Sequence, residues 1–147
     1  MKLNVKVIKT KKKHKPIVRQ MLKEMSDCLV KMGDRPPMKI KANNRSYIVM
    51  IDGAIVGTFS LSKYVFGRCK SFYRFYIKEE YRGTGVAKLV MQKAEEICGK
   101  DLSGFILNVY NKNVGAIKLY EKMGYTTYHL EGIYIYMEKE INKKGDN

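Results

Sequence analysis

A short glycine turn between two different segments restricts this chain more than any other feature. Residues 79–88 read EEYRGTGVAK, which places two glycines beside Arg82. The aromatic-rich segment KSFYRFYIK at 70–78 is typical of a strand, and GTGVAKLVMQKAEEICGK at 83–100 has apolar residues at helical spacing. Glycines let a backbone approach a ligand closely, and a helix N-terminus offers N–H groups without helical partners. The sequence therefore predicts a strand, a diphosphate-binding turn and a helix in succession.

Two familiar phosphate loops do not match this turn. A Walker loop ends in Gly-Lys-Ser/Thr, which does not occur in the chain. A dinucleotide fingerprint needs a third glycine where Lys88 stands, close to the start of a βαβ series. Here a hairpin signal and a further strand precede the turn, so this second type of loop is also excluded.

The rest of the chain predicts one mixed α/β domain. Apolar residues recur every four positions from Ile17 to Leu29, which indicates an amphipathic helix over about 15–32 whose Met-rich stripe packs into the core. Asp52-Gly53 between two apolar runs is a strong hairpin signal. The expected elements are a strand from Leu3, the helix 15–32, a loop at 33–44, the hairpin around 52–53, the strand at 70–78, a helix ending at Gly99, a strand at 104–110, a helix at 113–124 and two strands around Glu131-Gly132. The tail 141–147 is expected to fray.

Length and composition agree with a single domain spanning residues 1–147. Apolar residues make up 45% of the chain and charged residues 29%, as in soluble globular proteins. No apolar run approaches the length of a membrane span, and the N-terminal segment lacks the apolar stretch of a signal peptide. Cys28, Cys69 and Cys98 are scattered, without a CxxC pair, which argues against a disulfide framework and a zinc site. We therefore expect a cytoplasmic protein that holds no metal.

The charge balance is strongly basic. The chain has 29 Lys and Arg against 14 Asp and Glu, a formal net charge of +15. Such a field attracts polyanions and speeds their encounter with the protein. A solvated basic face, an anionic ligand, an acidic partner and nucleic acid all stay open as explanations. The run KTKKKHK at 9–15 matches no nucleic-acid recognition motif, so any such binding would be electrostatic and non-specific.

The turn carries the pattern Arg-x-x-Gly-x-Ala at Arg82, Gly85 and Ala87. In this setting it resembles the acetyl-CoA loop of the GNAT superfamily of N-acetyltransferases. The segment LNVYNKNVGAIKLYEKMGY at 107–125 resembles that family's other signature, and its matching positions are Asn113, Ala116, Tyr120, Gly124 and Tyr125. The resemblance runs from about Leu3 to Lys139. It implies the GNAT fold, a mixed and mostly antiparallel central sheet flanked by helices, in the order β-α-β-β-β-α-β-α-β-β.

The resemblance also implies roles for particular residues. Acetyl-CoA would be the cofactor, with CoA as the product, and Tyr120 would be the general acid that protonates the departing thiolate. A backbone N–H near Ile77 would meet the oxyanion. Asn113 would bind the cofactor arm or would simply cap a helix. The other cofactor-binding candidates are Phe75, Tyr76 and Ile77 beside the pantetheine arm, and Arg82, Gly83, Thr84, Gly85, Val86, Ala87 and Lys88 around the diphosphate. For two of these residues an ordinary structural role is the alternative: Val86 would be a core residue of the helix, and Lys88 an exposed helix lysine.

No general base is assigned. The strand before the turn has no carboxylate, and the strand after the helix offers Asn108. Glu79 and Glu80 are the nearest acids in sequence, and a water chain is the other candidate. His14 lies in a Lys-rich segment that we expect to be exposed. His129 lies in a late strand, which often flanks the acceptor pocket in this family.

Two hypotheses for function follow. The first is an N-acetyltransferase that transfers acetyl from acetyl-CoA to a primary amine. The acceptor is open between a peptide or protein amine, a nucleotide-type amine and a small metabolite, while the net charge disfavours polyamines and aminoglycosides. The second is a GNAT-shaped, CoA-binding module without turnover that uses its basic surface to bind nucleic acid or an acidic partner. Edge-strand pairing into a homodimer is common in this fold and is left open.

Overall fold

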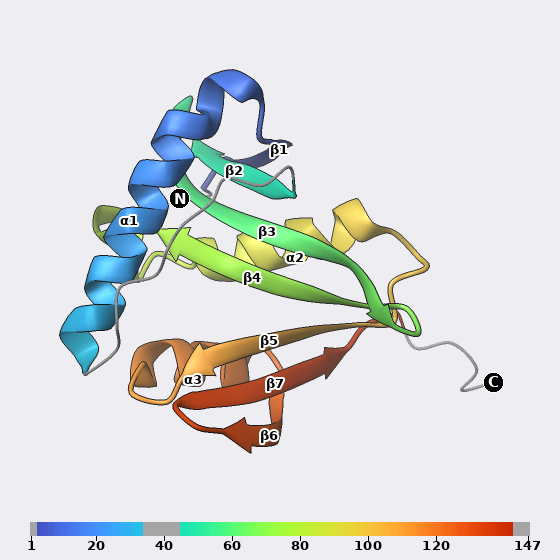
Figure 1. Cartoon of the computed structure of the whole chain (residues 1–147). Helices are drawn as coiled ribbons and strands as arrows, with labels where there is room; N and C mark the ends of the chain where they lie inside the picture. The colour runs from blue at the N-terminus through green and yellow to red at the C-terminus, as the bar shows by residue number, and fades with distance from the viewer. Residues whose placement is uncertain (1–2, 34–44, 143–147) are drawn as a thin grey trace.

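A computed structural model describes residues 3–33 and 45–142 and has the expected mixed α/β architecture (Figure 1). The strands and helices follow the predicted order. They are β1 Val5–Lys9, α1 Lys15–Met32, β2 Ser46–Ile51, β3 Ala54–Phe66, β4 Cys69–Ile77, α2 Val86–Cys98, β5 Gly104–Tyr110, α3 Val114–Lys122, β6 Thr126–Glu131 and β7 Tyr134–Glu140, with short 3-10 turns η1 Lys12–His14 and η2 Glu79–Tyr81. The predicted fold class is confirmed. Most of the loop expected at 33–44 lies outside the described residues.

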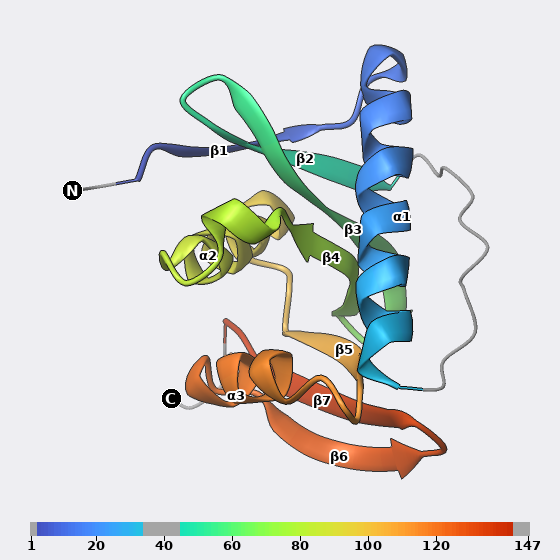
Figure 2. The same ribbon diagram turned by 90° about the vertical axis from the view of Figure 1, so that its left-hand side faces the viewer.

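The strands form one sheet in the order β1-β2-β3-β4-β5-β7-β6. Every neighbouring pair is antiparallel except β4 and β5, which run parallel in the middle of the sheet. Helix α1 covers one face, and α2 and α3 lie on the other (Figure 2). A parallel pair needs a crossover between its strands, and α2 is that crossover. The two halves of the sheet therefore meet at β4 and β5.

The turn between β2 and β3 shows why the hairpin could be predicted. Asp52 has φ 48° and Gly53 has φ 85°, so both central residues are left-handed. A two-residue hairpin of this kind matches the right-handed twist of its strands, and Asp-Gly accepts it at low cost. The predicted hairpin is confirmed.

Two hydrophobic cores hold the helices to the sheet. The larger core lies between the sheet and α2 and α3, and Phe59, Phe72 and Phe105 are buried at its centre. The smaller core lies under α1 and includes Met21 and Ile48. The Met-rich stripe of α1 therefore packs as predicted in its first half. Farther along the helix, Ser26 is buried, and the other side chains of residues 25–32 are only partly buried or exposed.

The C-terminal end is held against the α2–β5 connection. The N–H of Ile141 donates to the Ser103 carbonyl at 2.8 Å. The Asn142 amide donates to the carbonyls of Gly99 and Leu102 at 3.0 and 3.1 Å. The tail expected to fray over 141–147 is thus hydrogen-bonded at its first two residues, and 143–147 lie outside the described residues. None of the helices described is long and apolar enough to cross a membrane.

Candidate active site

The parallel strands β4 and β5 pair over only a short stretch and then part. Their register covers Cys69 with Gly104, Lys70 with Phe105 and Ser71 with Ile106. Beyond this point the strands border a cleft of about 880 Å³, whose lining also comes from α1, the glycine turn, α2, α3 and β7. The edges of β4 and β5 that would otherwise pair are therefore available to a ligand.

A bulge in β4 lies on this stretch. Tyr73 pairs with Ser60 and Tyr76 pairs with Thr58, so Arg74 and Phe75 together oppose a single residue of β3. Arg74 has φ 52°, a left-handed conformation that costs a non-glycine residue about 1–3 kcal/mol. Bulges bend a strand and increase its twist. The bulge accounts for the turning of β4 away from β5.

The end of β4 presents a backbone donor to the cleft. The Lys78 N–H donates to the Val56 carbonyl at 2.8 Å, so these two residues form a hydrogen-bonded antiparallel pair. Backbone groups of successive residues in such a ladder point to opposite edges of the strand. The N–H of Ile77 therefore points to the edge of β4 that borders the cleft. This is the donor for which the sequence suggested an oxyanion role.

The glycine turn is tied to the end of β4 by Arg82. Its Nε donates to the Ile77 carbonyl at 2.9 Å, and its guanidinium lies 5.2 Å from the centre of the Tyr76 ring. Gly85 stands just before α2 with φ 85°. In the described chain, the N–H groups of residues 83–88 donate to no backbone carbonyl, while those of Arg82 and Leu89 on either side do. The turn therefore offers a series of N–H groups without backbone acceptors at a helix N-terminus.

The structure brings almost all predicted site residues to one place. The predicted residues that line the cleft are Phe75, Tyr76, Ile77, Arg82, Gly83, Gly85, Val86, Ala87, Lys88, Asn113 and Tyr120. Thr84 does not line it, because its hydroxyl points back into the turn and donates to the Tyr81 carbonyl at 2.6 Å. The Val86 side chain is buried in the core.

Tyr120 lies on α3, and its side chain is only 9% exposed. Its ring centre is 5.8 Å from that of Tyr125, a second buried tyrosine that does not line the cleft. Burial raises the pKa of Tyr120 to about 12. The hydroxyl is therefore protonated at neutral pH and can act as a proton donor into the cleft.

Asn113 lies just before α3 and caps it. Its side-chain oxygen accepts a hydrogen bond from the Ala116 N–H at 3.3 Å. Of the two roles considered for Asn113, the cap is thus present in the structure. Asn113 also lines the cleft, and its amide nitrogen is not used by the cap.

The cleft has cationic residues and no carboxylate among the described residues that line it. Glu79 and Glu80 are exposed in η2 and do not reach its lining. The sequence did not reveal Glu24 on α1, which hydrogen-bonds the Tyr76 hydroxyl. Burial first, and then the charge of this carboxylate, raise the pKa of Tyr76.

The two histidines lie away from the cleft lining. His129 is exposed on β6, with its Nε2 3.7 Å from the Glu131 carboxylate. His14 closes the first turn of η1, where its Nδ1 accepts from the Lys11 N–H at 3.1 Å. Within the described residues, no group of three or more His, Cys, Asp or Glu side chains could hold a metal ion.

Several lining residues were not found by sequence reasoning. Helix α1 contributes the second half of its apolar stripe, which a sequence cannot separate from core packing. Arg74 lies in the bulge, and β5 and β7 contribute residues on the sheet face toward α1. The missed lining residues on α1, β4, β5 and β7 include Met25, Cys28, Leu29, Met32, Tyr73, Arg74, Asn108, Tyr110 and Tyr134.

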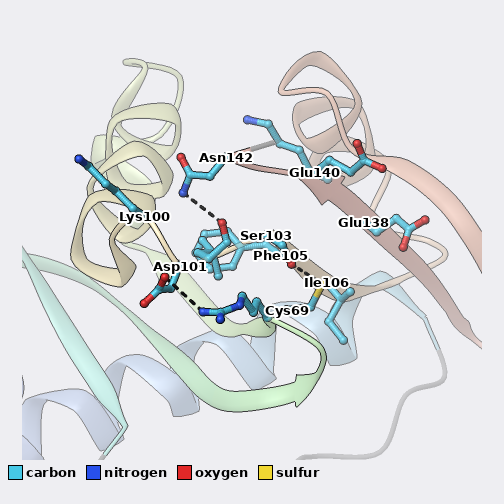
Figure 3. Close-up of a pocket in the computed structure, with 12 residues that line it drawn as sticks. Cys69, Lys100, Asp101, Ser103, Phe105, Ile106, Glu138, Glu140 and Asn142 are labelled. Atoms are coloured by element: carbon cyan, nitrogen blue, oxygen red, sulfur yellow. Dashed lines mark hydrogen bonds and ion pairs between the residues drawn. The ribbon is translucent and has the colours of Figure 1, made fainter. Parts of the chain in front are cut away.

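A second hollow of about 620 Å³ lies at the opposite end of β4 and β5, where the two strands still pair (Figure 3). Cys69 and Ser103 meet there at 3.6 Å, and Arg68 pairs with Asp101 at 3.2 Å. Both members of the ion pair are well exposed, so solvent screens it. None of the predicted site residues lines this hollow. The candidate active site is therefore the cleft between the parted strands.

Comparison with known proteins concerns the fold and the family of the chain. Three solved structures share the fold. The PaiA N-acetyltransferase of Thermoplasma acidophilum, in complex with coenzyme A, is 15% identical with a TM-score of 0.74, and the match covers 94% of this chain and 99% of that one. The ribosomal-protein-S18-alanine N-acetyltransferase of Escherichia coli is 14% identical with a TM-score of 0.72, covering 97% of each chain. A GNAT-family acetyltransferase of Listeria monocytogenes is 10% identical with a TM-score of 0.76, covering 96% and 99%.

At these identities the likeness to solved structures shows the fold alone. No curated protein sequence matches the chain. The family model of the acetyltransferase (GNAT) family matches residues 18–125, from α1 to the end of the second signature. Since that range covers well over half of the sequence, the protein belongs to the acetyltransferase (GNAT) family.

Proposed function

We propose that this protein is an N-acetyltransferase that transfers the acetyl group of acetyl-CoA to a primary amine. The observation that carries the proposal is the cleft between β4 and β5, which has an open turn of backbone donors at one end and the buried hydroxyl of Tyr120 in its lining. PaiA, which has the same fold, was solved with coenzyme A bound.

The glycine turn fits a diphosphate. A side-chain carbon added to Gly83 or Gly85 would meet no atom within 4 Å, so the space above the turn is open. The N–H groups of residues 83–88 donate to no carbonyl of the backbone that the structure describes, and the N-terminus of α2 adds partial positive charge. Arg82 and Lys88 line the same end of the cleft and add full charges. These groups would hold the phosphates of the cofactor.

The edge of β4 fits the amide-containing arm of the cofactor. Past the bulge none of the described strands pairs with this edge, and the Ile77 N–H points from it into the cleft. A chain with amide groups can pair with such an edge as an added strand does. The same N–H would hydrogen-bond the acetyl carbonyl oxygen as negative charge develops on it.

Acetyl-CoA supplies the acetyl group as a thioester. The acceptor amine nitrogen bonds to the acetyl carbon, and the carbon–sulfur bond breaks. Tyr120, protonated because burial raises its pKa to about 12, donates its hydroxyl proton to the departing sulfur. The amine must lose a proton, and since no carboxylate is among the described lining residues, we propose that water in the cleft accepts it.

The alternative is a CoA-binding module without turnover. The lack of a carboxylate among the described lining residues favours it. A buried tyrosine in the lining of the cleft favours the enzyme, since a module would have no use for a proton donor there.

The test is thiol release from acetyl-CoA by wild type and Tyr120→Phe with a panel of primary amines. We expect acceptor-dependent release that falls roughly 100-fold in Tyr120→Phe, the usual contribution of a general acid. Calorimetry should show unchanged acetyl-CoA binding. Tyr125→Phe is the matched control, because it removes the hydroxyl of the neighbouring buried tyrosine outside the cleft.

Each contrary result has a distinct meaning. Equal release by wild type and Tyr120→Phe would remove Tyr120 from the mechanism. Acetyl-CoA binding without release for any amine would support the module. No acetyl-CoA binding would overturn the assignment of the glycine turn.

A further inference from the structure

The cleft is lined from both faces of the sheet. Past the point where β4 and β5 part, its lining comes from α1 on one face and from α2 and α3 on the other (Figure 2). Tyr120, the proposed proton donor, belongs to the larger core on the side of α2 and α3. Tyr76 belongs to the smaller core under α1. The cleft therefore has one buried tyrosine on each side of the sheet.

Tyr76 directly precedes the proposed oxyanion donor on β4. Side chains alternate along this strand, so Phe75 and Ile77 pack against the larger core while Tyr76 packs toward α1. The N–H of Ile77 points from the edge of β4 into the cleft. An acetyl carbonyl held by that N–H would lie next to the strand position of Tyr76. The amine that attacks this carbonyl from the α1 side would pass the same residue.

The Tyr76 hydroxyl has a carboxylate partner on α1. It donates a hydrogen bond to Glu24, since an ionised carboxylate can only accept. The other charged or titratable groups that act on this hydroxyl are Cys28, one turn after Glu24, and Arg82, whose guanidinium lies 5.2 Å from the ring centre. Tyr76 and Cys28 line the cleft, whereas Glu24 does not. The hydroxyl thus connects the cleft to a carboxylate behind its lining.

Glu24 is placed to take up a proton and to release it. It belongs to none of the ion pairs found among the described residues. The residue is partly exposed, so solvent reaches it. Tyr120 on the other side of the sheet differs in this respect, because burial is the cause of its raised pKa and no carboxylate acts on it. One tyrosine is therefore suited to give a proton and the other to pass one on.

We infer that Tyr76 and Glu24 form the relay through which the acceptor amine loses its proton. The proton leaves the ammonium nitrogen through a cleft water for the Tyr76 oxygen, while the Tyr76 hydroxyl proton moves to a carboxylate oxygen of Glu24. Glu24 then releases this proton to solvent. The nitrogen, which now has a free electron pair, bonds to the acetyl carbon. A second proton leaves the nitrogen in the tetrahedral adduct and replaces, through water, the one that Tyr120 gives to the sulfur.

This inference rests on the proposed acetyl transfer and deepens it. The lining of the cleft, as far as the structure describes it, has no carboxylate, and water alone was the proton acceptor considered for it. The relay gives that water a carboxylate to pass the proton to. It also assigns the two proton transfers to opposite faces of the sheet, with the sulfur on the α3 side and the amine on the α1 side.

The experiment measures thiol release from acetyl-CoA with the panel of primary amines in variants of the relay. Glu24→Gln and Tyr76→Phe should each lower kcat at least about tenfold at neutral pH, with acetyl-CoA affinity unchanged in calorimetry. Glu24→Asp keeps the charge at a shorter reach and should lose less. The double variant should be no slower than the slower single variant, because both changes break one relay. Asp27→Asn is the control, since it removes one negative charge from an exposed position of the same helix.

The pH dependence separates a proton relay from a structural defect. A lysine-like amine has an ordinary pKa of about 10.4, so raising the pH deprotonates it without help from the protein. The ratio of kcat/KM between wild type and Glu24→Gln should therefore fall from at least about tenfold near neutral pH toward about one near pH 10. A structural defect would lower kcat/KM by the same factor across this range.

Titration of Tyr76 tests the hydrogen bond in the free protein, without any acceptor. The Glu24 carboxylate helps to raise the pKa of Tyr76, so this pKa should fall in Glu24→Gln, while burial keeps it above the ordinary value. NMR of ring-labelled tyrosine follows the titration, and Tyr76→Phe identifies the signal. Asp27→Asn should leave the Tyr76 pKa in place.

The outcomes separate this inference from the proposed function. Wild-type rates in Glu24→Gln, a loss of activity that does not depend on pH, or an unchanged Tyr76 pKa in Glu24→Gln would each overturn the relay while acetyl transfer stands. Acetyl-CoA binding by wild type without release for any amine would contradict the proposed function, and the relay with it. Failure of wild type to bind acetyl-CoA would contradict the assignment of the cleft itself.

Discussion

The two ends of the cleft depend on different parts of the polypeptide. At the turn end, residues 83–88 offer backbone N–H groups, and glycine provides the left-handed conformation before α2. At the bulge end, the backbone of Arg74 is left-handed, although glycine would adopt this conformation at lower cost. The turn therefore has a sequence suited to its backbone, whereas the bulge keeps a side chain that its backbone disfavours. That difference is what suggests that the side chain of Arg74 has a function.

The largest effect is expected from the strand that backs the C-terminal end of β4, next to the glycine turn. A side-chain carbon on Gly57 of β3 would come within 2.6 Å of the Tyr76 carbonyl oxygen and of the Ile77 side chain. Gly57→Ala should therefore lower the free energy of unfolding by roughly 1–3 kcal/mol, since β3 and β4 must separate. Denaturant unfolding measures this.

The same substitution should weaken acetyl-CoA binding, because it displaces the end of β4 on which the Ile77 N–H lies. Unchanged stability and affinity would show that the strand end relaxes freely. In that case the position of the C-terminal end of β4 would not depend on close packing of β3 against β4.

The turn end is tested by a matched pair of glycines. Gly85 in the turn and Gly53 in the hairpin both have φ 85°, and a side-chain carbon would meet no atom within 4 Å at either position. Substitution to alanine should cost each about 1–2 kcal/mol of stability for the same backbone reason. Only Gly85→Ala should weaken acetyl-CoA binding, by about tenfold, equivalent to 1.4 kcal/mol. Equal affinity of the two variants would contradict a ligand over the turn.

The turn end could be predicted from the sequence because the residues that indicate its structure are adjacent in the chain. Gly83, Gly85 and the apolar spacing of α2 are adjacent in the chain, and the hairpin at Asp52-Gly53 could be read in the same way. The second signature, at 107–125, likewise placed Tyr120 on a helix beside the cleft. Where a conformation follows from neighbouring residues, the sequence was sufficient.

The bulge end could not be predicted because its features depend on distant contacts. Nothing in SFYRFYI shows that Arg74 rather than a neighbour takes positive φ, since that depends on the pairing of β4 with β3. Glu24 reaches Tyr76 only because α1 crosses the sheet at that point. Thr84 fits the motif, yet its hydroxyl donates within the turn and does not line the cleft.

A smaller effect is expected when the bulge is given the residue that its backbone favours. Arg74→Gly removes the cost of a left-handed arginine, about 1–2 kcal/mol, and adds the unfolded-state entropy of glycine, about 0.5–1 kcal/mol. The variant should be as stable as wild type or up to about 1.5 kcal/mol more stable, as thermal or denaturant unfolding would show. It should retain acetyl-CoA affinity, as calorimetry would show. A clear loss of stability would mean that packing of the arginine stem outweighs the strain.

The smallest effect on stability is expected at Asn113, which lies between β5 and α3 and combines features of both ends. Its oxygen caps α3 through the Ala116 N–H, a local backbone role, while the residue also lines the cleft. Serine caps helices about as well as asparagine, so Asn113→Ser should unfold within a few tenths of a kcal/mol of wild type, whereas Asn113→Ala should lose about 1 kcal/mol. Calorimetry should show acetyl-CoA binding weakened several-fold in both variants, because neither keeps the amide nitrogen and one hydrogen bond contributes about 0.5–1.5 kcal/mol. Wild-type affinity in Asn113→Ser would make Asn113 a helix cap only, and the cofactor would then be held by the turn and the β4 edge without it.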